Sequence, residues 1–302
     1  MVESRKARTE TVRLSSEVTL RVLRWDGRPP GFVLVHGLAS NALLWVGVAS
    51  ALSGAGAPAG ADSGGTGPAV IAIDLRGHGE STVPSSGYDT ATAAADVATV
   101  IESLGLNRPV VVGQSWGGNV VVELAATEPS LIGAIALVDG GWISLRDTFD
   151  TWAAVLQKLT PPDQGDRRWS DISAKIRAAH PDWAHWAIEA TMANLRERQD
   201  GSVRARLARH HHLSILRSMW DHSINERYAA VRVPALLIPA GQRSGPQLAA
   251  VNRAAAELSG SDVRWYEDAD HDVHAQHPRQ LATDLLALYE RVGATATSAE
   301  NW

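Results

Sequence analysis

Short apolar runs that contain no charged residue recur along this chain and constrain its fold more than any other feature. They lie at residues 32–35, 69–73, 110–112, 135–138 and 233–238. Strands that are buried on both faces of a parallel sheet have this continuous apolar composition, whereas strands with one solvated face alternate. Residues 90–104 have the spacing of an amphipathic helix, and residues 117–126 form a second helical stretch between runs. The alternation predicts an α/β protein.

The strand-like runs stop once, after Trp142, and resume near Val233. The segment between them is helical in composition and rich in tryptophan. An α/β pattern interrupted in this way predicts a sheet domain with an inserted helical cap. The expected divisions are a first part of the core at 1–141, a cap at 142–228, a second part of the core at 229–293, and a loose tail at 294–302.

Weaker patterns complete the expected element order. Residues 11–25 alternate between apolar and polar types, which predicts two antiparallel strands before the first buried run. Residues 54–67 are rich in Gly, Ala and Ser and predict a loop. After the cap we expect a helix at 247–258, a strand at 263–266 and a last helix from 278 to about 291.

Composition excludes several classes of protein. The 302 residues include no cysteine, which rules out disulfides, Cys-ligated metal and a thiolate nucleophile. A net charge of −5 argues against a nucleic-acid partner, which would require a basic face. No run of about 18 apolar residues is present, so we expect no contact with a membrane and a soluble, cytoplasmic protein.

The segment Gly113-Gln114-Ser115-Trp116-Gly117 follows a buried run and opens a helical stretch. G-x-S-x-G in that context predicts a nucleophile elbow, a tight strand-to-helix turn that lifts the serine hydroxyl above the sheet. Gly at both flanking positions suits this turn because a side chain there would collide with neighbouring backbone. The alternative is a glycine-rich turn with an incidental serine.

His36-Gly37-Leu38 ends the run at 32–35, at the sheet edge where ligands of α/β proteins bind. Acyl transfer needs two N–H groups near the developing oxyanion. We assign these donors to the backbone amides of Leu38 and Trp116. The alternative is that His36-Gly37 is only a turn.

Four segments together resemble the α/β-hydrolase fold family with a helical cap. They are His36-Gly37, Asp74-Leu75-Arg76-Gly77-His78-Gly79-Glu80-Ser81, Gly113 to Gly118, and Asp270-His271 before Pro278. The resemblance implies an eight-stranded, mostly parallel sheet flanked by helices, with Ser115 as nucleophile. It also implies that His271, seven positions before Pro278, is the general base. In the family the D-x-R-G-x-G-x-S segment is a structural turn, so Asp74, Arg76 and His78 are not expected to be catalytic.

Other histidines offer alternatives. His274 and His277 lie near His271 in the sequence, with Asp270 and Asp272 as nearby carboxylates, so a metal site is a competing interpretation. His210-His211-His212 cannot all point at one ion, because adjacent residues on a helix face different directions. We expect this cluster to lie on a solvated helix surface, with His212 as the member that can reach down from the cap.

The acid departs from the common pattern of the family. Members usually carry it in a G-x-x-D turn after the strand that follows the cap, but this chain has Gly241-Gln242-Arg243-Ser244 there. Asp139, directly after the run at 135–138, offers a replacement on the same sheet edge. That placement resembles haloalkane dehalogenases and certain lactone hydrolases. The alternatives are Asp270, Asp272 or no acid at all.

The residue types predict a reaction class. A serine nucleophile forms an acyl-enzyme, so the expected substrate is a carboxylic ester or lactone. The tryptophan-rich cap favours an apolar small molecule, with His36, Trp142 and His212 as candidate substrate contacts. We expect no cofactor or metal, and a monomer or homodimer. Competing hypotheses are a carbon–carbon bond hydrolase or lyase on the same fold, and a receptor-like binding protein with little turnover.

Overall fold

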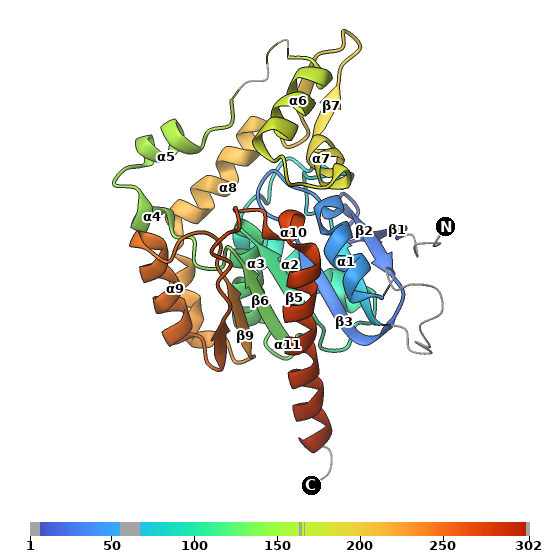
Figure 1. The fold of residues 1–302 in the computed structure, drawn as a ribbon, viewed down its shortest axis with the longest axis vertical. Coiled ribbons are helices and arrows are strands. Elements are labelled where there is room, and N and C mark those ends of the chain that lie inside the picture. Colours follow the sequence, from blue (N-terminus) through green and yellow to red (C-terminus); the bar gives the residue numbers. More distant parts are fainter. Residues whose placement is uncertain (1–6, 55–66, 163–164, 166, 300–302) are drawn as a thin grey trace.

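The computed structural model describes residues 7–54, 67–162, 165 and 167–299. Eight strands form one sheet in the order β1-β2-β4-β3-β5-β6-β9-β10 (Figure 1). β1 pairs antiparallel with β2 and β2 pairs antiparallel with β4, whereas all further neighbours are parallel. This confirms the expected mostly parallel, eight-stranded sheet. The strands are β1 (Arg8–Arg13), β2 (Thr19–Trp25), β3 (Arg28–Val35), β4 (Pro68–Ile73), β5 (Val110–Gln114), β6 (Ala134–Val138), β9 (Ala235–Ile238) and β10 (Ser261–Val263).

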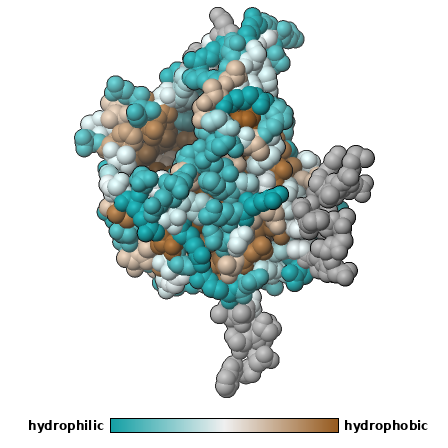
Figure 2. Space-filling view, viewed as in Figure 1, coloured by the Kyte–Doolittle hydropathy of each residue, from teal (hydrophilic) through white to brown (hydrophobic). Residues whose placement is uncertain are grey.

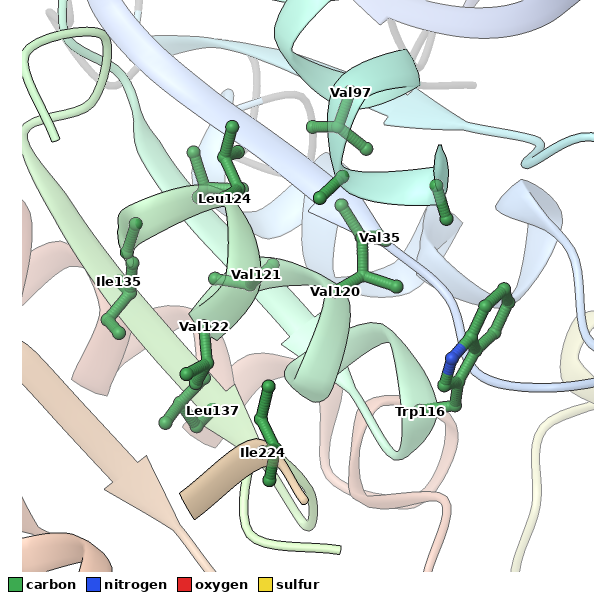
Figure 3. Close-up of a cluster of buried hydrophobic side chains, with 14 of the residues drawn as sticks. Val35, Val97, Trp116, Val120, Val121, Val122, Leu124, Ile135, Leu137 and Ile224 are labelled. Atoms are coloured by element: carbon green, nitrogen blue, oxygen red, sulfur yellow. The ribbon is translucent and has the colours of Figure 1, made fainter. Parts of the chain in front are cut away.

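Helices cover both faces of the sheet, which explains why its central strands are apolar throughout. One face packs against α2 (Thr90–Ser103), α3 (Trp116–Thr127) and α9 (Gly245–Glu257). Figure 3 shows Val120, Val121 and Leu124 of α3 among side chains of the sheet in this layer. The other face packs against η1 (Ala42–Trp45), α1 (Val46–Leu52), α10 (Val273–Gln276) and α11 (Pro278–Ala299).

The connection from β6 to β9 forms the cap, above the sheet edge where the parallel strands end (Figure 1). It contains α4 (Leu145–Thr148), α5 (Trp152–Leu159), α6 (Trp169–Ala179), α7 (His185–Met192), β7 (Leu195–Glu197), β8 (Val203–Ala205), α8 (Arg209–Asp221) and η2 (Ile224–Ala230). The antiparallel β7–β8 hairpin was not expected. Each of its strands has three residues, which is too few to show the alternation of apolar and polar residues that predicts a strand.

Polar contacts join one side of the cap to the core. The Asn41 side-chain Nδ2 donates to Asn194 Oδ1 at 2.6 Å. Arg206 forms an ion pair with Glu80 at 2.6 Å. His180 Nδ1 lies 3.2 Å from Asp270 Oδ2, so the cap also contacts the loop before α10.

Two expected element boundaries need correction, and a third expected element lies mostly outside the described residues. The last strand is β10 at Ser261–Val263, and Tyr266 adds only an isolated bridge to Ala240. α11 runs on to Ala299, through most of the segment expected to be a loose tail. The expected loop at 54–67 lies outside the described residues apart from its two ends. Among the helices that the structure describes, none has the length and apolar composition needed to cross a bilayer.

Candidate active site

Ser115 lies at the turn from β5 to α3, with φ 55° and ψ −126°. This left-handed conformation is uncommon for a residue with a side chain. The turn is possible because Gly117 lies against the end of β3, where a Cβ would be 2.6 Å from the Val35 carbonyl oxygen. The Ser115 amide donates to the carbonyl of Val138 at 3.0 Å, which joins the turn to the end of β6. The geometry is that of a nucleophile elbow.

Asp139 follows β6 directly and also has a positive φ, of 40°. Its amide donates to the Ile238 carbonyl of β9 at 2.9 Å. The next residue, Gly140, lies so close to the Ser115 backbone that a Cβ there would collide with the serine carbonyl group. The absence of a side chain at Gly140 therefore allows the turns after β5 and β6 to lie side by side.

His271 lies in the loop before α10, and its Nδ1 atom is 2.6 Å from Asp139 Oδ2. The Gln114 side-chain Nε2 donates to the His271 carbonyl oxygen at 3.0 Å and holds this loop against the end of β5. The Asp139 side chain is 11% exposed and that of His271 is 53% exposed. Burial lowers the pKa of His271, but the hydrogen bond and charge of Asp139 and the charges of Asp272 and Asp270 raise it by more, so the net pKa lies above its ordinary value.

The second carboxylate oxygen of Asp139 has two donors that fix its orientation. The Ala240 amide donates to Oδ1 at 3.1 Å and the Gln247 side chain donates to the same oxygen at 2.9 Å. Gln247 was missed by sequence reasoning, because a glutamine in a helix carries no local signal of such a role.

Neither of the alternative acids is hydrogen bonded to the His271 ring among the described residues. Asp270 accepts from the Asp272 amide at 2.9 Å and contacts His180 of the cap. Burial raises the pKa of Asp272, and no hydrogen bond from that carboxyl group to His271 is formed among the described residues. Ser244 is exposed at the start of α9. The structure thus pairs His271 with Asp139.

A cavity of about 310 Å³ opens above Ser115. Figure 2 shows an apolar hollow between α5 and α8 on this side of the molecule. The polar side chains that line the cavity are Ser115, His212 and His271. Its apolar lining comes from both the core and the cap, and consists of Leu38, Trp116, Ile143, Leu145, Leu159, Leu216 and Met219.

The two residues assigned to an oxyanion hole, Leu38 and Trp116, both line this cavity beside Ser115. Trp116 is the first residue of α3, where the amide has no acceptor within the helix. Gly37, which precedes Leu38, would place a Cβ 2.9 Å from the Ser115 Cβ. The backbone of both residues therefore lies close to the serine side chain.

Of the three candidate substrate contacts, only His212 lines the cavity. His36 is fully buried beneath the turn: its Nδ1 lies 2.7 Å from the Gly37 carbonyl oxygen, and its Nε2 accepts from the Leu75 amide at 3.1 Å. Both ring nitrogens are therefore engaged by backbone, so the expectation of substrate contact at His36 is corrected to a structural role. Trp142 is buried in the core rather than exposed to the cavity, which corrects the same expectation for that residue.

The segment that begins at Asp74 is a structural turn. Asp74 Oδ1 accepts from the Ala42 amide at 2.7 Å, and Oδ2 accepts from the Glu80 amide at 2.8 Å and from Arg21 at 2.6 Å. Arg76 forms a bidentate ion pair with Asp96, with both distances 2.6 Å. These contacts hold the segment against β2, η1 and α2.

The remaining histidines do not form one site. His211 is buried and stacks on Tyr88 with ring centroids 3.8 Å apart, which corrects the expectation that it lies on a solvated surface. His212 reaches the cavity from the cap, as expected, and His210 is exposed. His274 packs against Trp45, with ring centroids 4.5 Å apart. In the ranges that the structure covers, no three His, Asp or Glu side chains are grouped so as to hold a metal ion.

Comparison with known proteins adds three findings. The family described as alpha/beta hydrolase fold matches residues 30–163, a range that holds Ser115 and Asp139 and ends before His271. An uncharacterised protein of Mycobacterium tuberculosis is 32% identical over 124 residues, 41% of this chain and 33% of its own length. An esterase of the same organism is 35% identical over 121 residues, 40% of this chain and 36% of its own length. The chain thus matches about a third of the length of these relatives.

Solved structures are similar over nearly the whole chain. The crystal structure of E-2-(acetamidomethylene)succinate hydrolase superposes with a TM-score of 0.75 and 22% identity. The superposition covers 94% of this chain and 99% of the other. A likeness at this identity shows a shared fold.

Proposed function

Because the chain belongs to the α/β-hydrolase fold family, we propose that it is a serine hydrolase that cleaves a carboxylic ester or lactone of a largely apolar small molecule. The observation that carries this proposal is that Ser115 and His271 line one cavity while His271 is hydrogen bonded to the buried carboxylate of Asp139. Nucleophile, base and acid are the three groups that acyl transfer through a serine requires.

The reaction proceeds in two displacements. His271 accepts the Ser115 hydroxyl proton as the serine oxygen attacks the substrate carbonyl, and the resulting imidazolium is stabilised by Asp139. The tetrahedral intermediate places its negative charge toward the Leu38 and Trp116 amides. His271 then protonates the leaving alcohol, which leaves an acyl group on Ser115. A water molecule, deprotonated by His271, releases the carboxylic acid and regenerates the serine.

The wall of the cavity supports an apolar substrate. Seven of its ten lining residues are apolar, and the described lining includes no Arg or Lys that would attract an anionic group. Small-molecule sites are commonly lined in this way, with a few polar groups that orient the ligand. A relative that is 35% identical over part of the chain is named an esterase, which agrees with cleavage of an ester bond.

His212 is the polar group in the cavity wall that the two displacements do not use. Burial lowers the pKa of His212, although a hydrogen bond to the Leu159 backbone raises it in part, so the ring is neutral at pH 7. A neutral imidazole that donates one N–H to a carbonyl offers its other nitrogen as an acceptor. We therefore propose that His212 accepts a hydrogen bond from a hydroxyl or N–H group of the substrate.

Intact mass after incubation with a fluorophosphonate tests the proposal. The wild type should gain one adduct rapidly, because an activated serine attacks phosphorus and displaces fluoride. Ser115→Ala should gain none under the same conditions. Absence of an adduct on the wild type, together with no hydrolysis across a panel of 4-nitrophenyl esters and lactones, would overturn the proposal in favour of a binding protein.

A further inference from the structure

We propose that Gln247 is a positioning residue, which orients the Asp139 carboxylate so that its other oxygen faces His271. The inference rests on the proposed function for its catalytic consequence. Its geometric part concerns three side chains that the structure places in one hydrogen-bonded chain, from Gln247 through Asp139 to His271.

The Gln247 amide nitrogen makes two hydrogen bonds. It donates to Asp139 Oδ1 at 2.9 Å and to the Ala240 carbonyl oxygen at 3.0 Å. Both acceptors are oxygen atoms, so the opposite orientation of the amide would place its oxygen against them. The orientation of the Gln247 side-chain amide is therefore fixed, and so is the direction from which it donates to Asp139 Oδ1.

The Ala240 amide completes the arrangement by donating to the same Oδ1 at 3.1 Å. Two donors on one carboxylate oxygen oppose rotation about the Cβ–Cγ bond. The other oxygen, Oδ2, is then held toward His271 Nδ1 at 2.6 Å. A triad acid works by holding the imidazole in one tautomer and orientation, so a carboxylate that rotates freely would perform this task poorly.

The position of Gln247 is linked to the unusual position of the acid. The turn after β9, Gly241 to Ser244, is where the sequence resemblance places a carboxylate, and here it leads directly into α9. Gln247 lies in the first turn of that helix. The segment after β9 therefore supplies no acid, but its Gln247 donates a hydrogen bond to Asp139, the acid after β6. This side chain links the ends of the adjacent strands β6 and β9.

Substitution of Gln247 by Leu tests the positioning role, because leucine has similar length and no donor. We expect kcat for a 4-nitrophenyl ester to fall about 10- to 100-fold, with KM within about twofold and a thermal midpoint close to that of the wild type. Gln242→Leu is the matched control, since Gln242 is exposed in the preceding turn. Equal kcat values for wild type and Gln247→Leu would overturn the inference.

Gln247→Glu provides a second test that depends on charge rather than packing. A carboxylate beside Asp139 favours the cationic form of His271, so the acidic limb of the kcat/KM profile should move to higher pH. A residue that lay away from Asp139 in solution would not move this limb. An unchanged limb in Gln247→Glu would show that residue 247 does not lie beside Asp139, which contradicts the positioning role.

Proton NMR separates failure of this inference from failure of the proposed function. A short hydrogen bond from His271 Nδ1–H to a carboxylate gives a far-downfield resonance, which His271→Asn identifies by its loss. We expect the signal in the wild type and in Gln242→Leu, and its loss or upfield movement in Gln247→Leu. If the wild type hydrolyses no ester but its resonance responds to Gln247→Leu, the positioning stands and the proposed function fails. If esters are hydrolysed and neither rate nor resonance responds, the positioning fails alone.

Discussion

Asp139 Oδ2 lies 2.6 Å from His271 Nδ1, although 132 positions of sequence separate the two residues. The pair joins the end of β6 to the loop before α10, and therefore the two parts of the core on either side of the cap. Burial lowers the pKa of His271, but the hydrogen bond and the negative charge of Asp139 help to raise it above its ordinary value.

Ser115→Ala should reduce ester hydrolysis by at least about 10³-fold, because no other described group in the cavity can form the acyl-enzyme. The fold should persist, since alanine needs no more space than serine at the turn. Steady-state assays with 4-nitrophenyl esters measure the loss, and circular dichroism checks the fold. Retention of full activity would exclude Ser115 as the nucleophile.

Asp139→Asn should lower kcat by about 10³- to 10⁴-fold, because an amide no longer holds His271 in the tautomer that accepts the serine proton. Asparagine tolerates the positive φ of 40° at this position, so the backbone should be preserved. Ser244→Ala, at the position where the acid is usually found, should leave kcat unchanged. The opposite pattern in the two variants would return the acid to the turn after β9.

The pH dependence of kcat/KM should show a limb that reports His271. The base must be neutral to accept the serine proton, and its pKa is raised, so activity should fall as the pH is lowered through a value above 6.5. Asp139→Asn removes part of what raises the pKa, and the residual activity should therefore fall at lower pH than in the wild type. Limbs at the same pH in both proteins would show that Asp139 does not act on His271 in solution.

His274→Phe should make the protein less sensitive to acid. His274 is fully buried, and neither ring nitrogen has a hydrogen-bond partner among the described residues. Burial lowers its pKa to about 3. An unfolded chain binds a proton at this residue near pH 6.5, so the free energy of unfolding falls by roughly 1 kcal/mol per pH unit as the pH drops below that value.

Phenylalanine keeps an aromatic ring beside Trp45 and has no titratable group, so it should remove this slope. Urea denaturation at several pH values between 4 and 7 measures it, and the difference from wild type isolates His274, since His36 and His78 have lowered pKa values in both proteins. Identical slopes for variant and wild type would contradict the assignment.

His212→Leu should reduce discrimination in favour of substrates that carry a hydrogen-bond donor. A lost hydrogen bond of about 1 kcal/mol corresponds to about a fivefold change in kcat/KM. The measurement is the ratio of kcat/KM for 4-nitrophenyl 3-hydroxybutanoate and 4-nitrophenyl butanoate. A ratio that does not differ between variant and wild type would remove His212 from substrate recognition.

Local constraints made part of the site predictable from sequence. The elbow depends on glycine at 113 and 117 and on an adjacent buried strand, all within a few residues of Ser115. The sheet was predictable for the same reason, because strands such as β5 and β6 are buried on both faces and are apolar throughout. Each of these signals lies within a single segment.

Contacts between segments far apart in the sequence were harder to predict. The position of Asp139 was inferred through a family resemblance, because nothing in the residues around it specifies a partner in a distant loop. The role of Gln247 could not be predicted, because a glutamine that donates to a carboxylate cannot be distinguished in the sequence from any other glutamine in a helix. His36 was expected to face substrate, but a histidine at a strand end can equally turn its ring into the underlying loop, where backbone groups engage both nitrogens.

Ser115 and Asp139, which directly follow the adjacent strands β5 and β6, both have a positive φ that non-glycine residues adopt at a cost of about 1–2 kcal/mol. Glycine would relieve that cost at either position, yet it would remove the hydroxyl or the carboxylate. The sheet edge that carries the chemistry is therefore less stable than the same backbone would allow. Selection for thermal stability alone would therefore not favour serine or aspartate at these two positions, so their retention in a stabilised variant would be a sign of selection for activity.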